Sequence, residues 1–323
     1  MVPRLGISMG DPLGIGPEIV VKALSVWRGR PVVVFGDVER LEAMRRMLVA
    51  DVSWQVVESL AQAEKAGELQ VLVVPGPAVT GPWGAVMAEA GQASYQYIVD
   101  AVNWHRKGGI CGLVTAPIHK EAIHRAGVSE PGHTEILARL LAAPRVAMML
   151  VGGGLRVTHI STHVSLVEAI ERVTADRIQA AVHLTAEILP QFGLVGGLIA
   201  VAGLNPHNGE HGLFGDVEER IIRPAVEQLA GQGMQVVGPI AADTVFARAK
   251  RQEFSAVIAL YHDQGHIPVK LLAFDQAVNL TLGLPMVRTS VDHGTAMDIA
   301  GQGVANAESL LAALSLADRL TQP

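Results

Sequence analysis

The chain has 323 residues, half of them apolar, with 34 glycines and few aromatic residues, a composition typical of an α/β enzyme with an ample core. Its net charge of −6 and its lack of a basic run argue against a nucleic-acid surface, and its single cysteine, Cys111, rules out an intramolecular disulfide framework. Since no stretch approaches about 18 apolar residues and no signal-peptide pattern is present, we expect a cytoplasmic protein that binds small ligands and no membrane.

Short β-rich runs alternate with amphipathic helical runs along the chain. The runs predicted as strands are Arg4–Met9, Val32–Phe35, Val71–Val74, Ile110–Thr115, Val146–Val151, Leu198–Ala202 and Ala256–Leu260. The runs with helical periodicity are Pro17–Trp27, Glu89–Lys107, Thr174–Leu189, Asp216–Leu229 and Val304–Leu320. Several strands are apolar throughout, which indicates burial on both faces and an α/β fold with a largely parallel sheet.

The chain shows no internal repeat and no Pro- or Ser-rich linker between autonomous domains. We therefore expect two joined lobes, with the chain crossing between them near residues 125 and 280. The terminal lobe would comprise residues 1–125 and 280–323, and the central lobe residues 126–279.

Polar residues are concentrated between Tyr261 and Asn306, in a chain that is otherwise apolar and weakly charged. They are His262, Asp263, His266, Lys270, Asn279, Arg288, Asp292, His293 and Asp298. Because unpaired buried polar groups carry a large desolvation cost, packing alone does not select them, and we interpret the segment as one wall of an active cleft. Its Lys and Arg, with the segment 132–135, could bind phosphate or carboxylate; exposure to solvent is the alternative for either cation.

Three pairs of histidines have the spacing i, i+4: His159/His163, His207/His211 and His262/His266. Each pair could hold a metal ion if its segment were helical. A glycine within the second pair and the strand-like RVTHIST at the first argue against a helix there, so one ligand per segment is the better interpretation. Spacing does not tell which, and hydrogen-bonded loop histidines remain the alternative.

The glycine-rich run 10–16, GDPLGIG, has neither the order G-x-G-x-x-G nor the lysine of a P-loop. A tight turn between a strand and a helix explains it equally well. No G-x-S-x-G sequence is present, so a serine hydrolase has little support.

Several segments together resemble the 4-hydroxythreonine-4-phosphate dehydrogenase family along nearly the whole chain. They are GDPLGIGPEI, TAPIHKEAI, GHTEIL, THVSL, GLNPHNGEHG, ADTVF, YHDQGHIPVK and NLTLGLPMVRTSVDHGTAMDIAG. The resemblance implies an isocitrate/isopropylmalate dehydrogenase-like fold, with two α/β/α lobes around a central cleft. It also implies an obligate homodimer whose active site is shared across the interface.

The resemblance also implies roles for the candidate site residues. The divalent-metal ligands would be His163, His207 and His262 in the central lobe, with His262 coming from the partner subunit. The substrate-binding residues would be His133, Thr134, Lys270, Asn279 and Arg288. Imidazole ligands suit Zn, Co or Ni, and Mg is a further candidate, so the ligand type does not fix the ion.

The segment HGTAMDIAGQGVAN looks like the adenosine-binding loop of the wider dehydrogenase group. By that likeness His293, beside Gly294, would lie near the adenine, and Asp298 would accept hydrogen bonds from the ribose hydroxyls. A carboxylate there would repel a 2′-phosphate, so NAD is expected in preference to NADP. Asp243 is the candidate proton acceptor or additional carboxylate near the metal, with a helix N-cap as the alternative.

The activity implied is oxidation of a secondary alcohol by NAD, followed by decarboxylation, with a metal ion acting as Lewis acid. The substrate would be a small phosphorylated hydroxy acid of the 4-phosphooxy-L-threonine type, as in pyridoxal phosphate synthesis. A sister branch acts on 4-phospho-D-threonate or 4-phospho-D-erythronate, and the forms MGDPLG and HIPVKLLAF lean toward it. An aromatic cis-dihydrodiol dicarboxylate substrate and a non-catalytic metal or phospho-metabolite binding protein are further alternatives.

Overall fold

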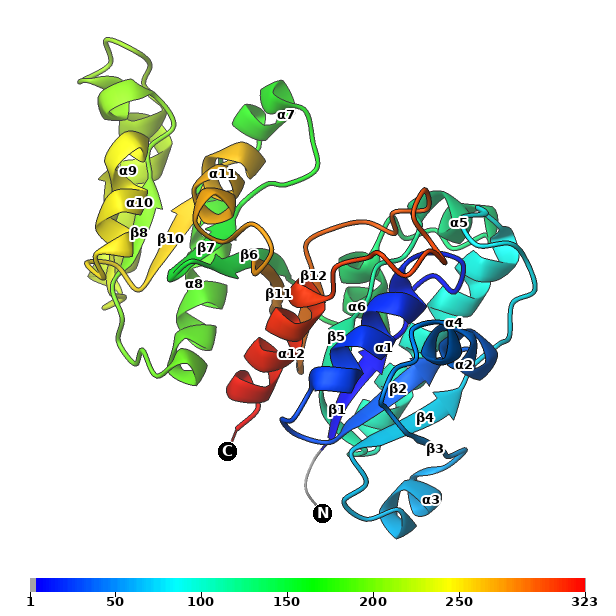
Figure 1. Cartoon of the computed structure of the whole chain (residues 1–323). Coiled ribbons are helices and arrows are strands. Elements are labelled where there is room, and N and C mark those ends of the chain that lie inside the picture. The colour runs from blue at the N-terminus through cyan, green and yellow to red at the C-terminus, as the bar shows by residue number, and fades with distance from the viewer. Residues whose placement is uncertain (1–3, 323) are drawn as a thin grey trace. The chain divides into compact units, whose positions relative to one another are not determined.

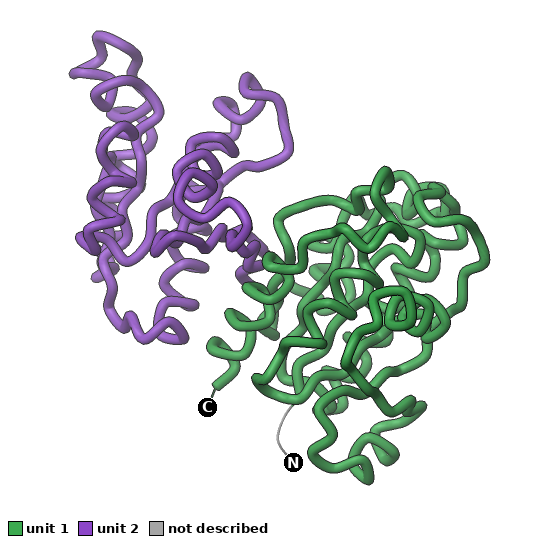
Figure 2. Tube along the Cα trace, in the orientation of Figure 1, with its two compact units in different colours: residues 1–144, 284–323 green, residues 145–283 purple. Residues whose placement is uncertain are grey.

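The computed structural model describes residues 4–322, and the chain divides into two compact units. Unit 1 comprises Met1–Pro144 and Leu284–Pro323, and unit 2 comprises Arg145–Gly283 (Figure 2). The chain enters unit 2 later than the crossing expected near residue 125, because α6 (His133–Leu140) packs on α4 (Ala88–Arg106) of unit 1. Each unit contains its own strands and helices (Figure 1), so the predicted α/β class is confirmed.

The six strands of unit 1 are all parallel to their neighbours, in the order β3-β4-β2-β1-β5-β12. They are β1 (Arg4–Ser8), β2 (Val32–Gly36), β3 (Gln55–Val56), β4 (Val71–Pro75), β5 (Ile110–Thr115) and β12 (Val287–Val291). The helices, apart from α4 and α6, are α1 (Gly16–Val26), α2 (Val38–Met47), α3 (Leu60–Lys65), α5 (Lys120–Arg125) and α12 (Glu308–Leu320). Every residue of β1 and β2 is buried, which accounts for the continuous apolar sequence VVVFG of β2.

Unit 2 has the strand order β11-β6-β7-β10-β8-β9. The strands are β6 (Ala147–Gly152), β7 (Leu155–His159), β8 (Ile199–Ala202), β9 (Val236–Ile240), β10 (Ala256–Ala259) and β11 (Val278–Leu282). Only β6 is antiparallel to its neighbours β7 and β11, because Gly153 and Gly154, both with positive φ, form the two-residue turn of a β6–β7 hairpin. The largely parallel arrangement predicted from the sequence is otherwise confirmed.

The helices of unit 2 pack against its strands. They are α7 (Leu166–Glu171), α8 (Ala175–Ile188), α9 (Arg223–Gly231), α10 (Ala242–Lys250) and α11 (His262–Ala273), with the short turns η1 (Leu189–Phe192), η2 (Pro206–Gly209) and η3 (Glu218–Ile222). Across residues 4–322, none of the helices combines the length and the apolar character that spanning a membrane requires.

The carboxyl ends of three neighbouring strands of unit 1 meet at one edge of the sheet. In the strand register, Ser8 of β1 is level with Thr115 of β5, and Thr115 is level with Ser290 of β12. The loops that follow these strands contain the glycine-rich run and the segment from 292 to 307. Because α/β sheets bind ligands beyond the carboxyl ends of their strands, this edge is where a site is expected.

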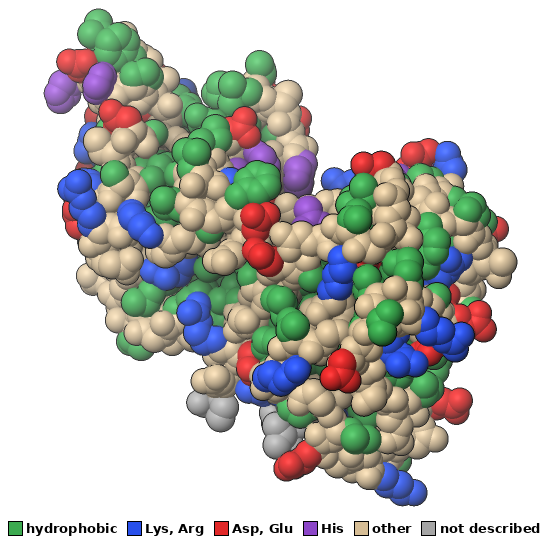
Figure 3. Space-filling model, in the orientation of Figure 1, with side chains coloured by type: hydrophobic (Ala, Val, Ile, Leu, Met, Phe, Trp, Pro, Cys, Tyr) green, Lys and Arg blue, Asp and Glu red, His purple; other side chains and the backbone are tan. Residues whose placement is uncertain are grey.

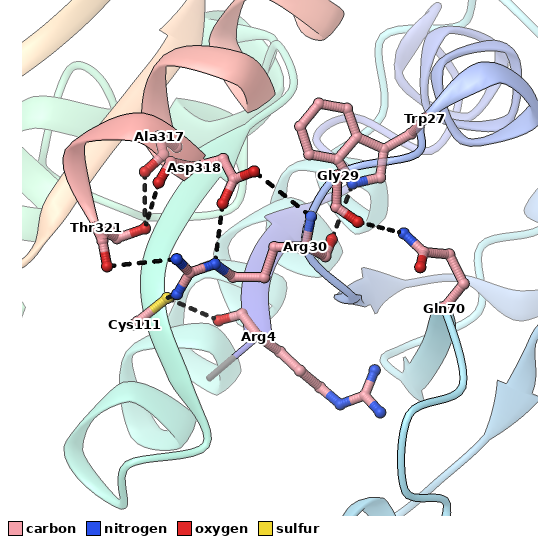
Figure 4. A network of polar contacts seen from close by, with 9 residues as sticks. All are labelled: Arg4, Trp27, Gly29, Arg30, Gln70, Cys111, Ala317, Asp318 and Thr321. Atoms are coloured by element: carbon pink, nitrogen blue, oxygen red, sulfur yellow. Dashed lines mark hydrogen bonds and ion pairs between the residues drawn. The ribbon is translucent and has the colours of Figure 1, made fainter. Parts of the chain in front are cut away.

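A polar network holds the last helix of unit 1 against the sheet (Figure 4). Arg30 Nε donates to Asp318 Oδ1 of α12 at 2.9 Å, and Arg30 Nη1 donates to the Cys111 sulfur at 3.3 Å. The Cys111 thiol in turn donates to the carbonyl oxygen of Arg4 at 3.3 Å. The single cysteine is therefore a hydrogen-bonded structural residue between β5 and β1.

We predict that replacing Gly91 by alanine destabilises unit 1. Gly91 lies where α4 meets α5, and a Cβ there would be 2.1 Å from the carbonyl oxygen of Ala122, a backbone atom that cannot rotate away. Gly91→Ala should lower the free energy of unfolding, measured with urea, by about 1–3 kcal/mol.

The matched control is Gly231→Ala at the end of α9, where a Cβ meets no atom within 4 Å. This change should leave stability unchanged or raise it by up to about 1 kcal/mol, because alanine is the better helix former. Equal effects of the two substitutions would show that the α4–α5 contact does not require a glycine.

Candidate active site

Arg288 brings a buried positive charge to the sheet edge of unit 1. It lies on β12, is 2 % exposed, and donates from Nη2 to Thr115 Oγ1 at 2.6 Å. Burial lowers the pKa of Arg288 and the nearby Glu135 carboxylate raises it. Since arginine stays protonated at neutral pH, the site carries a guanidinium that can bind phosphate or carboxylate by charge-assisted hydrogen bonds.

His133 and Thr134 form the first turn of α6, close to this guanidinium. Burial, followed by the charge of Arg288, lowers the pKa of His133 well below its usual value, so its imidazole is neutral near pH 7. His133 Nε2 is buried and makes no hydrogen bond to any residue between 4 and 322. The amides at the start of a helix favour a negative charge, so unit 1 combines three predicted substrate residues in a group suited to an anion.

The segment predicted to bind the nucleotide is fixed to α1 by a buried carboxylate. Glu18 is fully buried and accepts hydrogen bonds from the amides of Gly303 at 3.1 Å and Ala305 at 2.6 Å. Lys22, one turn later, pairs with Glu18 at 2.8 Å and donates to the carbonyl oxygens of the same two loop residues. This Glu18–Lys22 clamp sets the position of the loop after β12.

The three nucleotide-binding candidates His293, Gly294 and Asp298 are exposed in that loop. A Cβ at Gly294 would meet no atom within 4 Å, so space is open beside it. The loop also packs on the glycine-rich run, since the amide of Ile15 donates to the carbonyl oxygen of Thr295 at 3.0 Å. The run is a turn between β1 and α1, as the sequence allowed, and it supports the loop after β12.

Two polar groups that the sequence analysis did not single out lie at the same edge. Ser8 and Asp11 are fully buried, and Ser8 Oγ and Asp11 Oδ2 have no hydrogen-bond partner within the described part of the chain. Burial raises the pKa of Asp11, against the opposing effect of its hydrogen bond from the Leu13 amide. The only signal for Asp11 in the sequence is the GDP tripeptide, which is equally typical of a turn, and Ser8 lies within a predicted strand without any such signal.

Unit 2 brings two of the three predicted metal ligands together. His163 follows β7 and His262 is the first residue of α11, and their ring centroids are 5.9 Å apart. Asp263 Oδ1 lies 2.6 Å from His262 Nδ1. Because an ionised carboxylate only accepts, Nδ1 carries the hydrogen and Nε2 of His262 presents its lone pair, as a metal-binding histidine does.

His207 lies in a strained segment of unit 2 and does not join this pair. Every residue from 207 to 212 has positive φ, including the non-glycine residues His207, Asn208, Glu210 and His211. Left-handed backbone costs about 1–2 kcal/mol for each non-glycine residue, and strain of this kind is typical of functional sites. The buried Glu218 holds the base of this left-handed segment by accepting the amides of Leu204 at 2.7 Å and Asn205 at 2.6 Å.

The arrangement of the histidines differs from the expectation in one respect. The resemblance implied that His262 is the ligand set apart from the other two, whereas the structure has His163 and His262 side by side and His207 apart. Within residues 4–322 of a single chain, no group of three His, Cys, Asp or Glu residues could hold a metal ion.

The remaining candidates of unit 2 occupy three different elements. Asn279 is on β11, and its Oδ1 is buried without a hydrogen-bond partner in the range 4–322. Lys270 is on the outer part of α11, with Nζ 5.5 Å from the ring centre of Phe274. Asp243 is exposed in the first turn of α10, whose N-cap is Ala241, so the N-cap alternative for Asp243 is wrong. Helix α10 packs against η2, which carries His207.

Comparison with known proteins identifies relatives over the whole chain. The profile of the family described as pyridoxal phosphate biosynthetic protein PdxA matches residues 28–317. The chain is 45 % identical over 320 residues to a D-threonate 4-phosphate dehydrogenase from Cupriavidus necator, covering 97 % of this chain and 96 % of that protein. It is also 45 % identical over 324 residues to a 4-hydroxythreonine-4-phosphate dehydrogenase from Beijerinckia indica subsp. indica, covering 99 % and 95 %.

A solved structure agrees with these relatives. The crystal structure of a 4-hydroxythreonine-4-phosphate dehydrogenase from Klebsiella pneumoniae matches with a TM-score of 0.90 and 40 % identity. The match covers 99 % of this chain and all of that one.

The neutral state of His133 leads to a prediction about pH. Its pKa is depressed in the folded chain, so below about pH 6.5 the unfolded chain binds a proton at His133 more readily than the folded chain does. His133 therefore lowers the free energy of unfolding as the pH falls. The contribution is at most about 1.4 kcal/mol per pH unit. Between pH 7.5 and 5.5, His133→Gln should therefore lose about 1 kcal/mol less unfolding free energy than the wild type, as measured with urea.

The exposed His183 of α8 provides the control, as His183→Gln. This variant should keep the wild-type dependence on pH. An unchanged dependence in His133→Gln would mean that His133 is not held neutral.

Proposed function

The chain belongs to the family of the pyridoxal phosphate biosynthetic protein PdxA, and from this premise we propose that it oxidises and decarboxylates a phosphorylated four-carbon 3-hydroxy acid. The enzyme is a decarboxylating dehydrogenase that acts on a CH–OH group. In the first step the alcohol carbon gives a hydride to NAD⁺ and the hydroxyl gives up a proton. In the second step the resulting β-keto acid loses carbon dioxide.

The observation that carries the substrate class is the anion group of unit 1. Arg288 is buried beside the amino terminus of α6, where His133 Nε2 lacks a partner in the described chain. A phosphate or carboxylate of the substrate would be attracted by the guanidinium charge and would give His133 Nε2 a partner, with Thr134 adding a hydroxyl. Lys270 and Asn279 of unit 2 are the other two substrate-binding candidates that the family resemblance gives. The intact GHTE segment, Asn279 and Arg288 favour a phosphorylated hydroxy acid over an aromatic dihydrodiol.

The histidine pair of unit 2 fits a divalent metal ion. His163 and His262 have a spacing at which two imidazoles could share an ion, and the Asp263 contact sets the tautomer that a ligand requires. When bound, the ion would supply Lewis-acid stabilisation of negative charge in both steps. Two imidazoles suit Zn, Co or Ni, and Mg remains a candidate from the family.

A second subunit would supply the third ligand. Unit 2 exposes large apolar side chains that a monomer would leave in water: Leu166 and Val167 of α7, Leu213 beside the left-handed segment, and Leu271 and Phe274 of α11. Figure 3 shows apolar side chains exposed over α7 and at the tip of this unit. Exposed apolar groups of this kind indicate a protein contact. In a homodimer, the partner's His207 would complete the site, and the partner's Asp243 would accompany it as the proton acceptor.

The nucleotide would bind at the exposed loop after β12. Asp298 would accept hydrogen bonds from the ribose hydroxyls, with His293 and Gly294 beside the adenine. The exposed Asp298 carboxylate would repel a 2′-phosphate, so NAD is favoured and NADP would bind more weakly.

The substrate is tested by offering two phosphorylated acids side by side. We expect metal-loaded protein to form NADH, followed by absorbance, from 4-phosphooxy-L-threonine or from 4-phospho-D-threonate, with loss of activity in EDTA. Relatives of both names are equally similar, and the HIPVKLLAF form favours the second substrate. Absence of EDTA-sensitive turnover with both, and with 4-phospho-D-erythronate, would contradict the proposed function.

The shared metal site is tested by mixing inactive variants. His163→Ala and His207→Ala should each be inactive as homodimers. If His207 crosses to the partner, a mixed dimer of the two variants contains one intact site. Unfolding and refolding an equal mixture should then restore about a quarter of the wild-type activity, because half of the dimers are mixed and each has one working site of two.

The matched control is a mixture of His163→Ala and His262→Ala. Because these ligands would come from the same chain, both sites of the mixed dimer are damaged and activity should stay absent. Recovery in this control would instead support the arrangement in which His262 is the residue that crosses.

A further inference from the structure

Two buried histidines, His159 and His266, lie behind His262 and take no part in the mechanism above. His159 ends β7 and is 3 % exposed, and His266 lies one turn after His262 on α11 and is 5 % exposed. The rings of His262 and His266 are stacked, with centroids 3.7 Å apart and planes 11° apart. The imidazole of His266 therefore packs against the ring of His262.

The hydrogen bonds of this pair fix which nitrogen carries the hydrogen. His266 Nδ1 lies 3.1 Å from the carbonyl oxygen of His262, which only accepts, so Nδ1 of His266 is the donor. The same Nδ1 lies 3.1 Å from His159 Nε2, which must therefore be the acceptor. The stacked ring of His266 is therefore hydrogen-bonded to His159 at the end of β7.

The chain makes room for this contact at Gly265. A Cβ at that position would lie 2.2 Å from His159 Nε2 and 2.8 Å from Val157 Cγ1. Any larger residue would push α11 away from the imidazole. The contact between β7 and α11 therefore depends on a glycine between the two histidines of the HDQGH segment.

We propose that His159 and His266 are positioning residues of the metal site, which hold the His262 ring in the orientation that presents Nε2 to the ion. The alternative restraint, Asp263, has a side chain that is 70 % exposed, so its bond to His262 competes with water. The His159–His266 pair is buried and does not. The proposal rests on the proposed function, because it requires His262 to be a metal ligand.

The test measures the affinity of the metal-free, full-length protein for Co²⁺, followed by the visible absorption of the bound ion. His266→Ala removes both the stacked ring and the bond to His159, and should weaken Co²⁺ binding about tenfold or more, as loss of an outer-shell partner does. His266→Asn keeps an N–H where Nδ1 stood and should recover part of the affinity. His266→Leu, which fills the space, replaces the alanine variant if that variant does not fold.

Two controls separate this role from a loss of folding or of the metal site itself. His183→Ala removes an exposed histidine of the same unit and should bind Co²⁺ as the wild type does. His163→Ala removes a proposed ligand; wild-type affinity in this variant would contradict the proposed metal site. If His163→Ala fails to bind while His266→Ala binds within twofold of the wild type, or while His266→Asn is no better than His266→Ala, the positioning role is overturned and the metal site stands.

Discussion

The geometry of unit 2 depends on one buried amide, that of Gln264 in the first turn of α11. Its Oε1 accepts from the Leu260 amide at 2.7 Å, and its Nε2 donates to the carbonyl oxygen of Gly203 at 2.8 Å. A helix of this kind would otherwise leave its start free to shift, because it has no side-chain N-cap and contains Pro268. The amide joins the helix start to the ends of β10 and β8. These two hydrogen bonds therefore also hold His262 and His266, which lie on either side of Gln264 in the same helix.

In unit 1 an ion pair holds the segment that carries the candidate residues. The loop after β12 is exposed to solvent. The Glu18–Lys22 clamp holds its backbone in one conformation. A buried carboxylate is costly unless its oxygens are bonded, and here two amides and an ammonium bond them. In both units a buried side chain, Glu18 or Gln264, holds a segment that carries candidate ligand-binding residues.

The core strands were predictable from the sequence, because short, continuous apolar runs between turn residues are typical of strands buried on both faces. The predicted strands do not include β3, β7, β9, β11 and β12, although the segment RVTHIST at β7 was described as strand-like. In β11 and β12, whose sequences are VNLTL and VRTSV, polar residues such as Asn279 and Arg288 interrupt the apolar run. The helix predicted over 304–320 begins only at Glu308, because the amides of Gly303 and Ala305 bond to Glu18 instead of continuing a helix. Contacts between residues far apart in the chain decide this boundary, and local patterns do not report them.

The histidine pairs show the same limit at the candidate site. One spacing, i and i+4, occurs in three different structures: a strand end followed by a loop, a left-handed segment, and a helix with stacked rings. The arguments against a helix at the first two pairs are confirmed. Spacing on a helix places His262 and His266 side by side, but it could not predict the bond from His266 to His159, more than 100 residues earlier in the chain.

The left-handed segment also constrains which amino-acid substitutions the protein can accept. Glycine at Asn208, Glu210 or His211 would relieve backbone strain, and selection for stability alone would favour it. This chain has bulkier residues at these positions and bears the cost in stability, as strained segments at functional sites do. Variants that gain heat resistance through this segment are the ones in which to look first for a weakened active site.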